Sequence, residues 1–559
     1  MPEPDQRATT AHFSETAECG VSAKRTMDFG PRGWLWIPCL LGVLVFLGFA
    51  LCRNITVPWV EDDNWYGAVY SQAAHNNLRA GMRVTAGVPA TLYFGALPIP
   101  TDAYYVHHPT LLPAMVTASF AVFGESEWAA RLVPIVCSLA SVILLWLLVA
   151  EAIGFRAATF TAAIFATLPM ELHYGDMVDF EPCLLVWMLA ALICLRRWQM
   201  SGWVWWAVLA VGSCLLAVLM DWPGYLFVIS LAGYFLLKWW RNVPVGAHIT
   251  PRRSLWIALG ILGAAGLAGV LFLVQIRWVR PDAWSDLWTA LTMRLSSSAA
   301  TDGAAVAISA EHFTLWQWCV AIVSGLSADF LLPPWFLAAA GLRLIWRARG
   351  KSEGLWWCGF AMMPMVVAGV LYVVILRNES FVHDFTTFYL IGALAIAAGI
   401  GLEGLFVWLE KKSRSRPLQT VMALAVIGAF AWLGEAALAR SEDLRSQFYV
   451  LDATKPEPPD FIPLLGREIA RRFPAGTGIL CNFAASGTLD YYSQRAVMNG
   501  LFTPADWAHF IAKEPPPIAG IVWMDAPDAS EIVTSLPSGE VSQITFCGYH
   551  FALWKSQAQ

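Results

Sequence analysis

Apolar runs of about 20 residues recur along the chain, with Trp, Tyr, Lys or Arg at their ends. This length matches a bilayer core, and such flanks are typical of helix ends at membrane–water interfaces. The first run lacks a small-residue cleavage pattern, so we interpret it as a retained span after a polar tail of residues 1–33. The pattern predicts eleven transmembrane helices, at residues 34–52, 131–150, 156–171, 183–198, 203–220, 224–239, 255–275, 328–346, 355–375, 387–408 and 418–438.

Two further apolar runs, at residues 109–124 and 313–326, are shorter. The first contains Pro109 and Pro113, which suits a helix lying at the membrane interface better than one that crosses it. We expect the same of the second. With both left out, Lys and Arg residues of the loops gather on one side of the membrane. By the positive-inside rule that side is cytoplasmic, so the N-terminus lies inside and the C-terminus outside.

The composition supports this fold class, a polytopic all-α membrane protein with about 11 transmembrane helices. Of the 559 residues, 57% are hydrophobic and 14% are charged, whereas about 25% of residues are charged in soluble domains. The formal net charge of −5 gives no reason to expect a nucleic-acid partner.

The pattern changes after residue 440, which divides a membrane module at 34–438 from a small soluble α/β domain at 440–559 on the outer side. An oxidising compartment would allow Cys481 and Cys547 in this domain to form a disulfide. The expected elements are helices at 460–473 and 503–514, and strands or a hairpin at 478–483, 518–525 and 544–556.

Acidic residues gather on the outer side of this topology. The first outer loop, 53–130, opens with "WVEDDNWY" (59–66), and a second outer loop carries Glu181 immediately before a span. An acidic loop beside a membrane is often only a solvated surface. Here the aromatic residues around Asp62 and Asp63 favour a position at the membrane interface. The segregation of acids to one face is what a site at the outer leaflet requires.

Three stretches carry a more specific pattern: "DDNWY" (62–66), "YYVHHPTLLPAMVTASFAVFGESEWAARLVP" (104–134) and "LPMELHYGDMVDFEPCLL" (168–185). Their order and spacing resembles the GT-C class of membrane glycosyltransferases, especially the bacterial branch related to protein O-mannosyltransferases and to the aminoarabinose transferase of lipid A. The resemblance covers about residues 34–240 and, more loosely, "HDFTTFYL" (383–390). The residues that fit the family element best are Phe123, Gly124, Glu127, Ala130, Arg131 and Leu132.

The resemblance implies an inverting enzyme that moves a sugar from a polyprenyl-phosphate donor to a hydroxyl of a lipid, glycan or protein acceptor. Asp62 is then the general base, and Asp63 and Glu181 position hydroxyl groups. The residues implied at the donor phosphate or the substrates are His107, His108, Arg131, Tyr66, His383 and Asp384. The matched branch works without a metal, so we expect no cofactor, although Asp62, Asp63, Glu181 and His383 are residue types that can hold a divalent ion. The implied location is a bacterial inner membrane, with the C-terminal domain in the periplasm.

Two departures from the family pattern bear on these assignments. Asp63 stands where the family has Glu, and His107-His108-Pro109 replaces Lys-Pro-Pro. Because a histidine is cationic only when protonated, the phosphate contact has alternative candidates in Arg131 and in a later outer loop. Those in the later loop are Arg277, Arg280 and Arg294.

Two other functional classes fit a polytopic chain. A transporter or flippase usually carries ionisable residues near the middle of the membrane and internal repeats, and neither pattern is evident here. A catalytically inactive scaffold would explain the replaced lysine, but the acids at Asp62 and Glu181 are retained. The sequence therefore favours a glycosyltransferase.

Overall fold

The computed structural model describes residues 36–60, 65–246, 248–297, 312–412, 416–445, 458–483, 486–499, 518–524, 539–547 and 549–556. Three predicted features lie outside these ranges. They are the tail of residues 1–33, the acidic residues 61–64 and the helix expected at 503–514.

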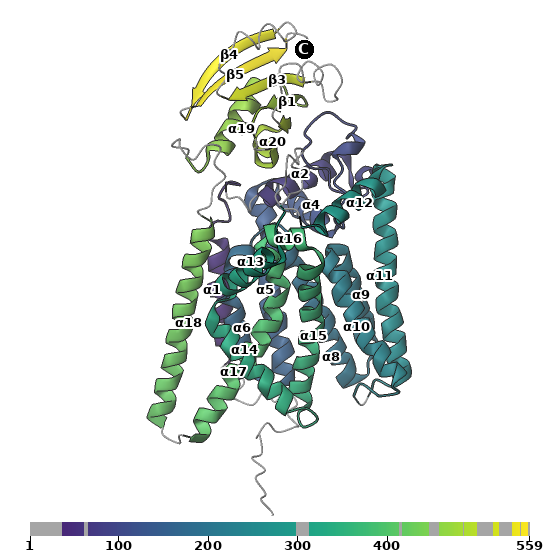
Figure 1. Ribbon diagram of the computed structural model, residues 1–559, viewed down its shortest axis with the longest axis vertical. Helices are drawn as coiled ribbons and strands as arrows, with labels where there is room; N and C mark the ends of the chain where they lie inside the picture. The colour runs from purple at the N-terminus through teal and green to yellow at the C-terminus, as the bar shows by residue number, and fades with distance from the viewer. Residues whose placement is uncertain are drawn as a thin grey trace, which may run out of the picture.

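Each predicted membrane segment coincides with a helix, and the long helices run side by side along the long axis of the molecule (Figure 1). Among the described residues, five helical segments are long and apolar enough to cross a membrane, or six if a bent pair counts as one span. The chain is therefore a multi-pass membrane protein, and eleven crossings remains a prediction. The helices that match predicted spans are α1 (Trp36–Cys52), α5 (Glu127–Ala152), α6 (Phe155–Ala166), α8 (Phe180–Ser201), α9 (Val204–Met220), α10 (Trp222–Trp240), α11 (Pro251–Val279), α14 (Leu332–Arg347), α15 (Glu353–Ile375), α17 (Ile391–Lys412) and α18 (Arg416–Arg445).

Small residues let two of these helices approach closely. A Cβ atom on Gly341 of α14 would lie 1.9 Å from the Ala397 carbonyl oxygen of α17, and one on Gly401 would lie 1.9 Å from the Leu337 carbonyl oxygen. Such contacts are how membrane helices gain packing energy where lipid offers no hydrophobic driving force.

The two shorter apolar runs form helices with geometries unlike a simple span. Helix α4 (Leu111–Phe123) has 13 residues, which gives it a length of about 20 Å, short of a hydrocarbon core about 30 Å thick. Helix α13 (Leu315–Phe330) makes an angle of 93° with α14, which follows it after one residue. Both geometries agree with the expectation that neither run crosses the membrane by itself.

Short elements connect the long helices at the end of the bundle that carries the C-terminal domain (Figure 1). They include most of the residues that the sequence analysis assigned to the outer side. These elements are α2 (Trp65–Ala80), α3 (Met82–Thr85), η3 (Thr101–Ala103), α7 (Pro169–Tyr174), α12 (Ala283–Arg294), α16 (Arg377–Val382) and η4 (Asp384–Leu390).

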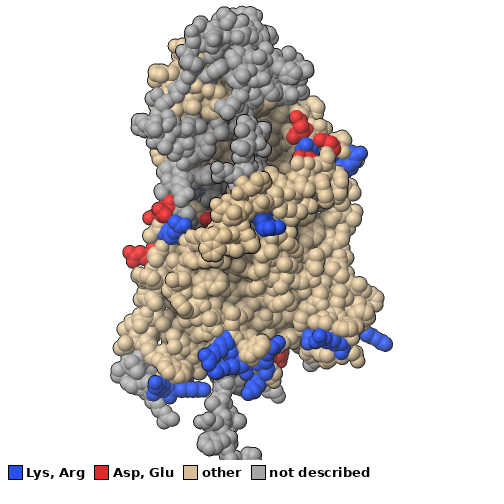
Figure 2. All heavy atoms as spheres, in the orientation of Figure 1, with Lys and Arg blue, Asp and Glu red and all other residues tan. Residues whose placement is uncertain are grey.

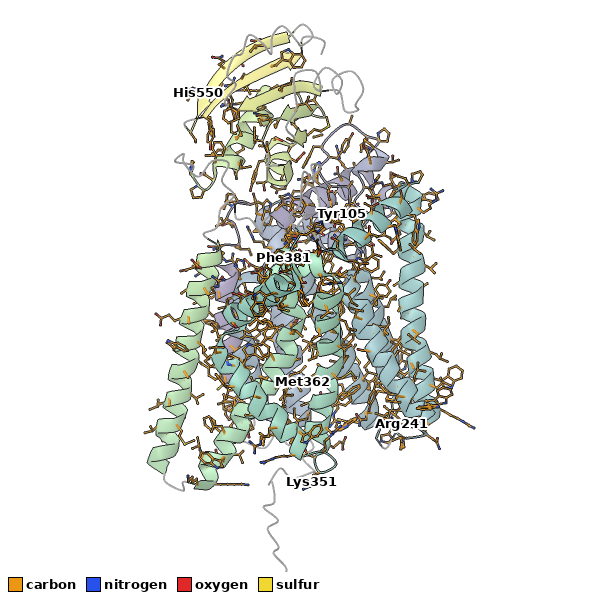
Figure 3. All side chains as sticks on the ribbon, viewed as in Figure 1. Tyr105, Arg241, Lys351, Met362, Phe381 and His550 are labelled. Atoms are coloured by element: carbon orange, nitrogen blue, oxygen red, sulfur yellow. The ribbon has the colours of Figure 1, made fainter. Side chains whose placement is uncertain are left out.

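Charge is distributed unevenly between the two ends. In Figure 2 the basic side chains gather mainly at the end away from the C-terminal domain, while acidic side chains appear mostly near the other end. Arg241 and Lys351 lie at the basic end, whereas Tyr105 lies near the C-terminal domain (Figure 3). This segregation is the one that the loop charges predicted.

The C-terminal domain is a five-stranded mixed sheet with two described helices. The strand order is β2-β1-β3-β5-β4, where β1 pairs in parallel with β2 and β3, and β5 pairs antiparallel with β3 and β4. Helix α18 continues to Arg445, beyond the predicted boundary at 438. The elements of the domain are α19 (Phe461–Arg472), β1 (Gly478–Cys481), α20 (Ser486–Ser493), β2 (Ala496–Asn499), β3 (Ile518–Met524), β4 (Gly539–Phe546) and β5 (Tyr549–Ser556).

The sequence predicted α19, β1, β3 and the hairpin of β4 and β5, but not the short elements α20 and β2. The structure answers the question of a disulfide, which the sequence left open. Cys481 is a free, fully buried cysteine in the apolar core of the domain, so no bond joins it to Cys547. Removal of the thiol from water raises its pKa, which lowers its reactivity.

Candidate active site

A buried hydrogen-bonded network joins four side chains from four different segments. The Tyr389 hydroxyl of η4 lies 3.2 Å from Glu181 Oε1 and 3.1 Å from Asp221 Oδ2. The other oxygen of Asp221, Oδ1, lies 2.8 Å from His108 Nδ1. All four residues are at most 8% exposed, so the network is shielded from bulk water.

Local sequence places the two acids of the network at helix ends. Glu181 stands in the first turn of α8, where the Asp179 side chain accepts a hydrogen bond from the Phe180 backbone N–H. Asp221 separates α9 from α10 and makes no capping bond of its own. Its carboxylate is thus available to His108 and Tyr389 instead of to the helix end.

The Tyr389 hydroxyl has two carboxyl groups within hydrogen-bond distance but only one proton to donate. A phenolic hydroxyl carries one proton, yet the Tyr389 oxygen lies between two carboxyl groups. Either the two carboxylates share the tyrosine proton, or one carboxyl group is protonated and donates its own proton to the tyrosine oxygen. Glu181 Oε2 is buried and has no hydrogen-bond partner among the described residues, so it can accept a bond from an incoming hydroxyl.

The two histidines lie in an aromatic and charged environment. The His108 ring stacks with two aromatic rings. Its centroid lies 4.6 Å from that of Phe180 and 5.9 Å from that of Tyr105. His107 Nε2 lies 3.2 Å from Asp286 Oδ2. Each histidine therefore has a carboxylate partner that fixes the orientation of its ring.

Of the three alternative arginines, Arg294 belongs most closely to this group. Its side chain is 7% exposed, its Nε lies 3.1 Å from Glu379 Oε2, and its Nη2 lies 3.3 Å from the Tyr105 hydroxyl. Arg280 instead pairs with Asp282 and Asp286. Arg277 donates to the Pro281 carbonyl oxygen at a more exposed position.

The remaining predicted residues form a second group beside the network. The Tyr66 hydroxyl lies 3.4 Å from His383 Nε2, and the Tyr66 ring contacts Phe385 edge-on at 5.6 Å. The Tyr174 hydroxyl donates a short hydrogen bond to Asp384 Oδ1. Tyr66 lies in α2, outside the membrane-spanning segments. Burial raises its pKa well above the usual value, and the negative charge of Asp179 adds to this, so the hydroxyl remains a hydrogen-bond donor.

Arg131 is placed differently from the expected phosphate contact. Its Nη1 donates to the Val57 carbonyl oxygen at 2.5 Å and to the Ile55 carbonyl oxygen at 3.2 Å. Its guanidinium carbon lies 4.1 Å from the centroid of the Trp59 ring. Since Arg131 is only 2% exposed, these contacts make it a support for the start of the first outer loop.

Asp62 and Asp63 lie outside the described residues. Of the residues on either side of them, Trp59 lies under the Arg131 guanidinium and the Tyr66 hydroxyl lies 3.4 Å from His383 Nε2.

The structure brings together six predicted residues: Glu181, His107, His108, Tyr66, His383 and Asp384. Tyr389 and Asp221 were not among the predicted site residues. The signal for Asp221 was an acid directly before Trp-Pro-Gly at the start of a helix, which resembles an ordinary cap. Within the described ranges, no group of three or more His, Cys, Asp or Glu side chains is arranged to hold a metal ion.

These features define the class of fold: a multi-pass helical membrane protein with a site at one end of the bundle and a small C-terminal sheet above it. The family model for dolichyl-phosphate-mannose-protein mannosyltransferases matches residues 107–251, which include His107, His108, Glu181 and Asp221. A sequence search of curated proteins finds no match.

Several solved structures share this fold. ArnT from Cupriavidus metallidurans bound to undecaprenyl phosphate has a TM-score of 0.61 at 14% identity, with 95% of this chain and 99% of that chain covered. The apo state of the same protein gives 0.58 at 15% identity, covering 94% and 98%. The archaeal oligosaccharyltransferase AglB from Archaeoglobus fulgidus, in complex with an inhibitory peptide and a dolichol-phosphate, gives 0.53 at 14% identity, covering 88% and 70%. The GT-C fold expected from the sequence is thereby confirmed.

Proposed function

We propose that the protein is a glycosyltransferase that takes a sugar from a polyprenyl-phosphate donor at the outer leaflet and gives it to a hydroxyl acceptor. The observation that carries this proposal is the buried network of Glu181, Tyr389, Asp221 and His108 next to the flanks of the acidic loop. The fold and the family match at 107–251 agree with it. A phosphate leaving group needs little acid assistance, so a carboxylate base and nearby donors suffice.

In this reaction Asp62 takes the proton from the acceptor hydroxyl. The acceptor oxygen forms a bond to the anomeric carbon as the bond from that carbon to the phosphate oxygen breaks. The electron pair leaves with the polyprenyl phosphate. A single displacement inverts the anomeric configuration. Asp63 and Glu181 orient the reacting hydroxyl groups, and no metal ion takes part.

The departing phosphate needs positive charge and hydrogen-bond donors. We assign this role to His108, His107 and Arg294, with the Tyr105 hydroxyl between them. Asp221 contacts His108 at Nδ1, which fixes the orientation of the ring. The two histidines and Arg294 thus take the place of the lysine in the related family pattern.

We also propose how the protein is oriented in the membrane and in which membrane it lies. Eleven crossings place the basic end of the bundle in the cytoplasm and the C-terminal domain on the outer side, which is the periplasm if the membrane is a bacterial inner membrane. The acceptor is a lipid, a glycan or a protein that reaches this face.

Native mass spectrometry of the gently purified protein tests the donor class first. We expect a retained polyprenyl phosphate, or its sugar-loaded form, or binding of undecaprenyl phosphate after addition in micelles. Binding of bulk phospholipid alone, with no uptake of added undecaprenyl phosphate, would contradict the proposal and direct the next experiments to transport.

Asp221→Asn tests the assignment of the network. The amide nitrogen of Asn cannot accept a hydrogen bond, so His108 or Tyr389 loses its buried partner. A buried unsatisfied donor costs about 1–3 kcal/mol, so we expect kcat to fall about 10- to 100-fold. Asp282→Asn is the matched control, because its side chain is 66% exposed and pairs only with Arg280 in the described network. Equal turnover of both variants and the wild type in a donor-consumption assay would remove Asp221 from the site.

A further inference from the structure

Helix α20 of the C-terminal domain touches the first outer loop at the point where the acidic segment begins. The Trp59 backbone N–H donates to the Tyr492 hydroxyl at 2.8 Å, and this hydroxyl donates to Glu127 Oε1, also at 2.8 Å. Glu127 stands in the first turn of α5. One hydroxyl therefore joins three segments that are far apart in the sequence: the first loop, a membrane helix and the C-terminal domain.

The Trp59 side chain is packed on several sides, so it has little freedom to move independently of Tyr492. The residue is 1% exposed, and Arg131 lies over its ring. The ring packs so closely on α2 that a Cβ atom on Gly67 would lie 2.4 Å from Trp59 Cζ3. Tyr491 contacts the same ring edge-on, with centroids 6.5 Å apart. A shift at Tyr492 is therefore transmitted to the loop because the packed indole ring has little room to adjust.

The same helix also holds the other flank of the acidic segment. A Cβ atom on Gly487 of α20 would lie 2.4 Å from Trp65 Nε1, and Gln72 of α2 donates to the Gly487 carbonyl oxygen at 2.7 Å. Trp59 and Trp65 bracket residues 60–64, which include Asp62 and Asp63. Both ends of the segment thus rest on one short helix that belongs to another domain.

We propose that α20 is a positioning element of the active site and that Tyr492 is its principal residue. This inference rests on the proposed function, in which Asp62 is the base. The C-terminal domain then does more than cover one end of the bundle, because it holds Trp59 and Trp65 on the two sides of the acidic segment. Tyr492 acts through the Trp59 backbone and touches no substrate, and it is therefore a positioning residue.

Tyr492→Phe in the full-length protein tests the contact directly. The ring is retained, while the Trp59 N–H loses its acceptor. We expect hydrogen exchange at the Trp59 amide and through the peptide 53–66, followed by mass spectrometry, to become about tenfold faster. We expect kcat for sugar transfer to fall about tenfold as well, with the KM for the donor unchanged, because the base is displaced and the phosphate site is not.

Two further variants keep the result interpretable. Gly487→Ala leaves Tyr492 intact but places a methyl group against Trp65, and it should lower kcat in the same way. Thr545→Val removes an exposed hydroxyl that bonds to His550 within the β4–β5 hairpin, and it should change neither exchange nor kcat.

The exchange comparison needs no substrate, so it is separate from the proposed function. Unchanged exchange at Trp59 in Tyr492→Phe would overturn the contact. Faster exchange with unchanged kcat in Tyr492→Phe would overturn the positioning role. A wild-type protein that neither binds undecaprenyl phosphate nor transfers sugar would overturn the proposed function and the role of Tyr492 in catalysis with it.

Discussion

Asp62→Asn should reduce sugar transfer by about 10²- to 10⁴-fold, the range usually lost with a general base. The asparagine side chain has nearly the same shape but cannot take a proton from the acceptor. Binding of the donor lipid and the folded state should change little, because the phosphate is assigned to His107, His108 and Arg294. The measurement is single-turnover transfer from a polyprenyl-phosphate sugar, with lipid binding followed in parallel by native mass spectrometry.

Glu61→Gln is the matched control for this variant. It neutralises the neighbouring carboxylate in the same loop and should leave transfer within a few-fold of the wild type. If Asp62→Asn retains wild-type turnover, the base is another residue, and Asp63 becomes the next one to test. Loss of transfer together with loss of donor binding would instead show that the substitution disturbs the whole site.

Arg445→Met should destabilise the protein by about 3–5 kcal/mol, the usual effect of removing one partner of a buried ion pair. Arg445 is the last residue of α18. Its Nη2 lies 2.5 Å from Asp176 Oδ1, and both side chains are at most 9% exposed. The same nitrogen also donates to the Leu172 and His173 carbonyl oxygens of α7. The substitution leaves the Asp176 carboxylate buried without its cation. Thermal unfolding in detergent, followed by intrinsic fluorescence, gives the loss as a lower apparent Tm.

A matched control and a double variant separate charge from packing. Arg440→Met on the same helix removes a pair with Asp443 whose side chains are 33% and 66% exposed, and it should cost about 1 kcal/mol, much less than the buried pair. Arg445→Met combined with Asp176→Leu should recover much of the stability, since an apolar pair often replaces a buried ion pair without loss. Equal apparent Tm values for Arg440→Met and Arg445→Met would contradict a stabilising role for the buried pair.

The loss of stability expected for Arg445→Met also concerns the candidate site. Helix α7, which Arg445 holds, ends at Tyr174, and the Tyr174 hydroxyl donates to Asp384 in the second group of site residues. The last helix of the bundle is therefore tied to the site at the point where the chain leaves for the C-terminal domain. The contacts of Arg445 with α7 and the contacts of α20 with Trp59 and Trp65 are thus two separate connections to the site residues.

The replacement of Lys-Pro-Pro by His107-His108-Pro109 has a physical explanation in these contacts. A lysine brings its own permanent charge and three donors. Here each histidine has a carboxylate beside it, Asp286 for His107 and Asp221 for His108. These carboxylates fix the orientation of the two imidazole rings, whereas a single lysine would need no such partner.

The sequence by itself determined the helical bundle, its charged ends and the end of the bundle at which most of the candidate site residues lie. A bilayer requires apolar runs of fixed length and excludes charge from its core, so these features are written locally in the chain. Glu181, His107, His108 and Tyr66 could be selected because they stand at the ends of such runs within a recognisable order of motifs.

Only the tertiary structure decided which of these residues meet and which others join them. Asp221 looks like an ordinary residue before a helix, and Tyr389 like one aromatic residue among many. Both enter the site through bonds to residues more than 100 positions away, Asp221 to His108 and Tyr389 to Glu181 and Asp221. Arg131 matches a family motif, yet it holds backbone carbonyls, and Tyr492 has no motif at all. Hydrogen bonds between distant segments depend on how helices pack, and no local pattern of residue types encodes that arrangement.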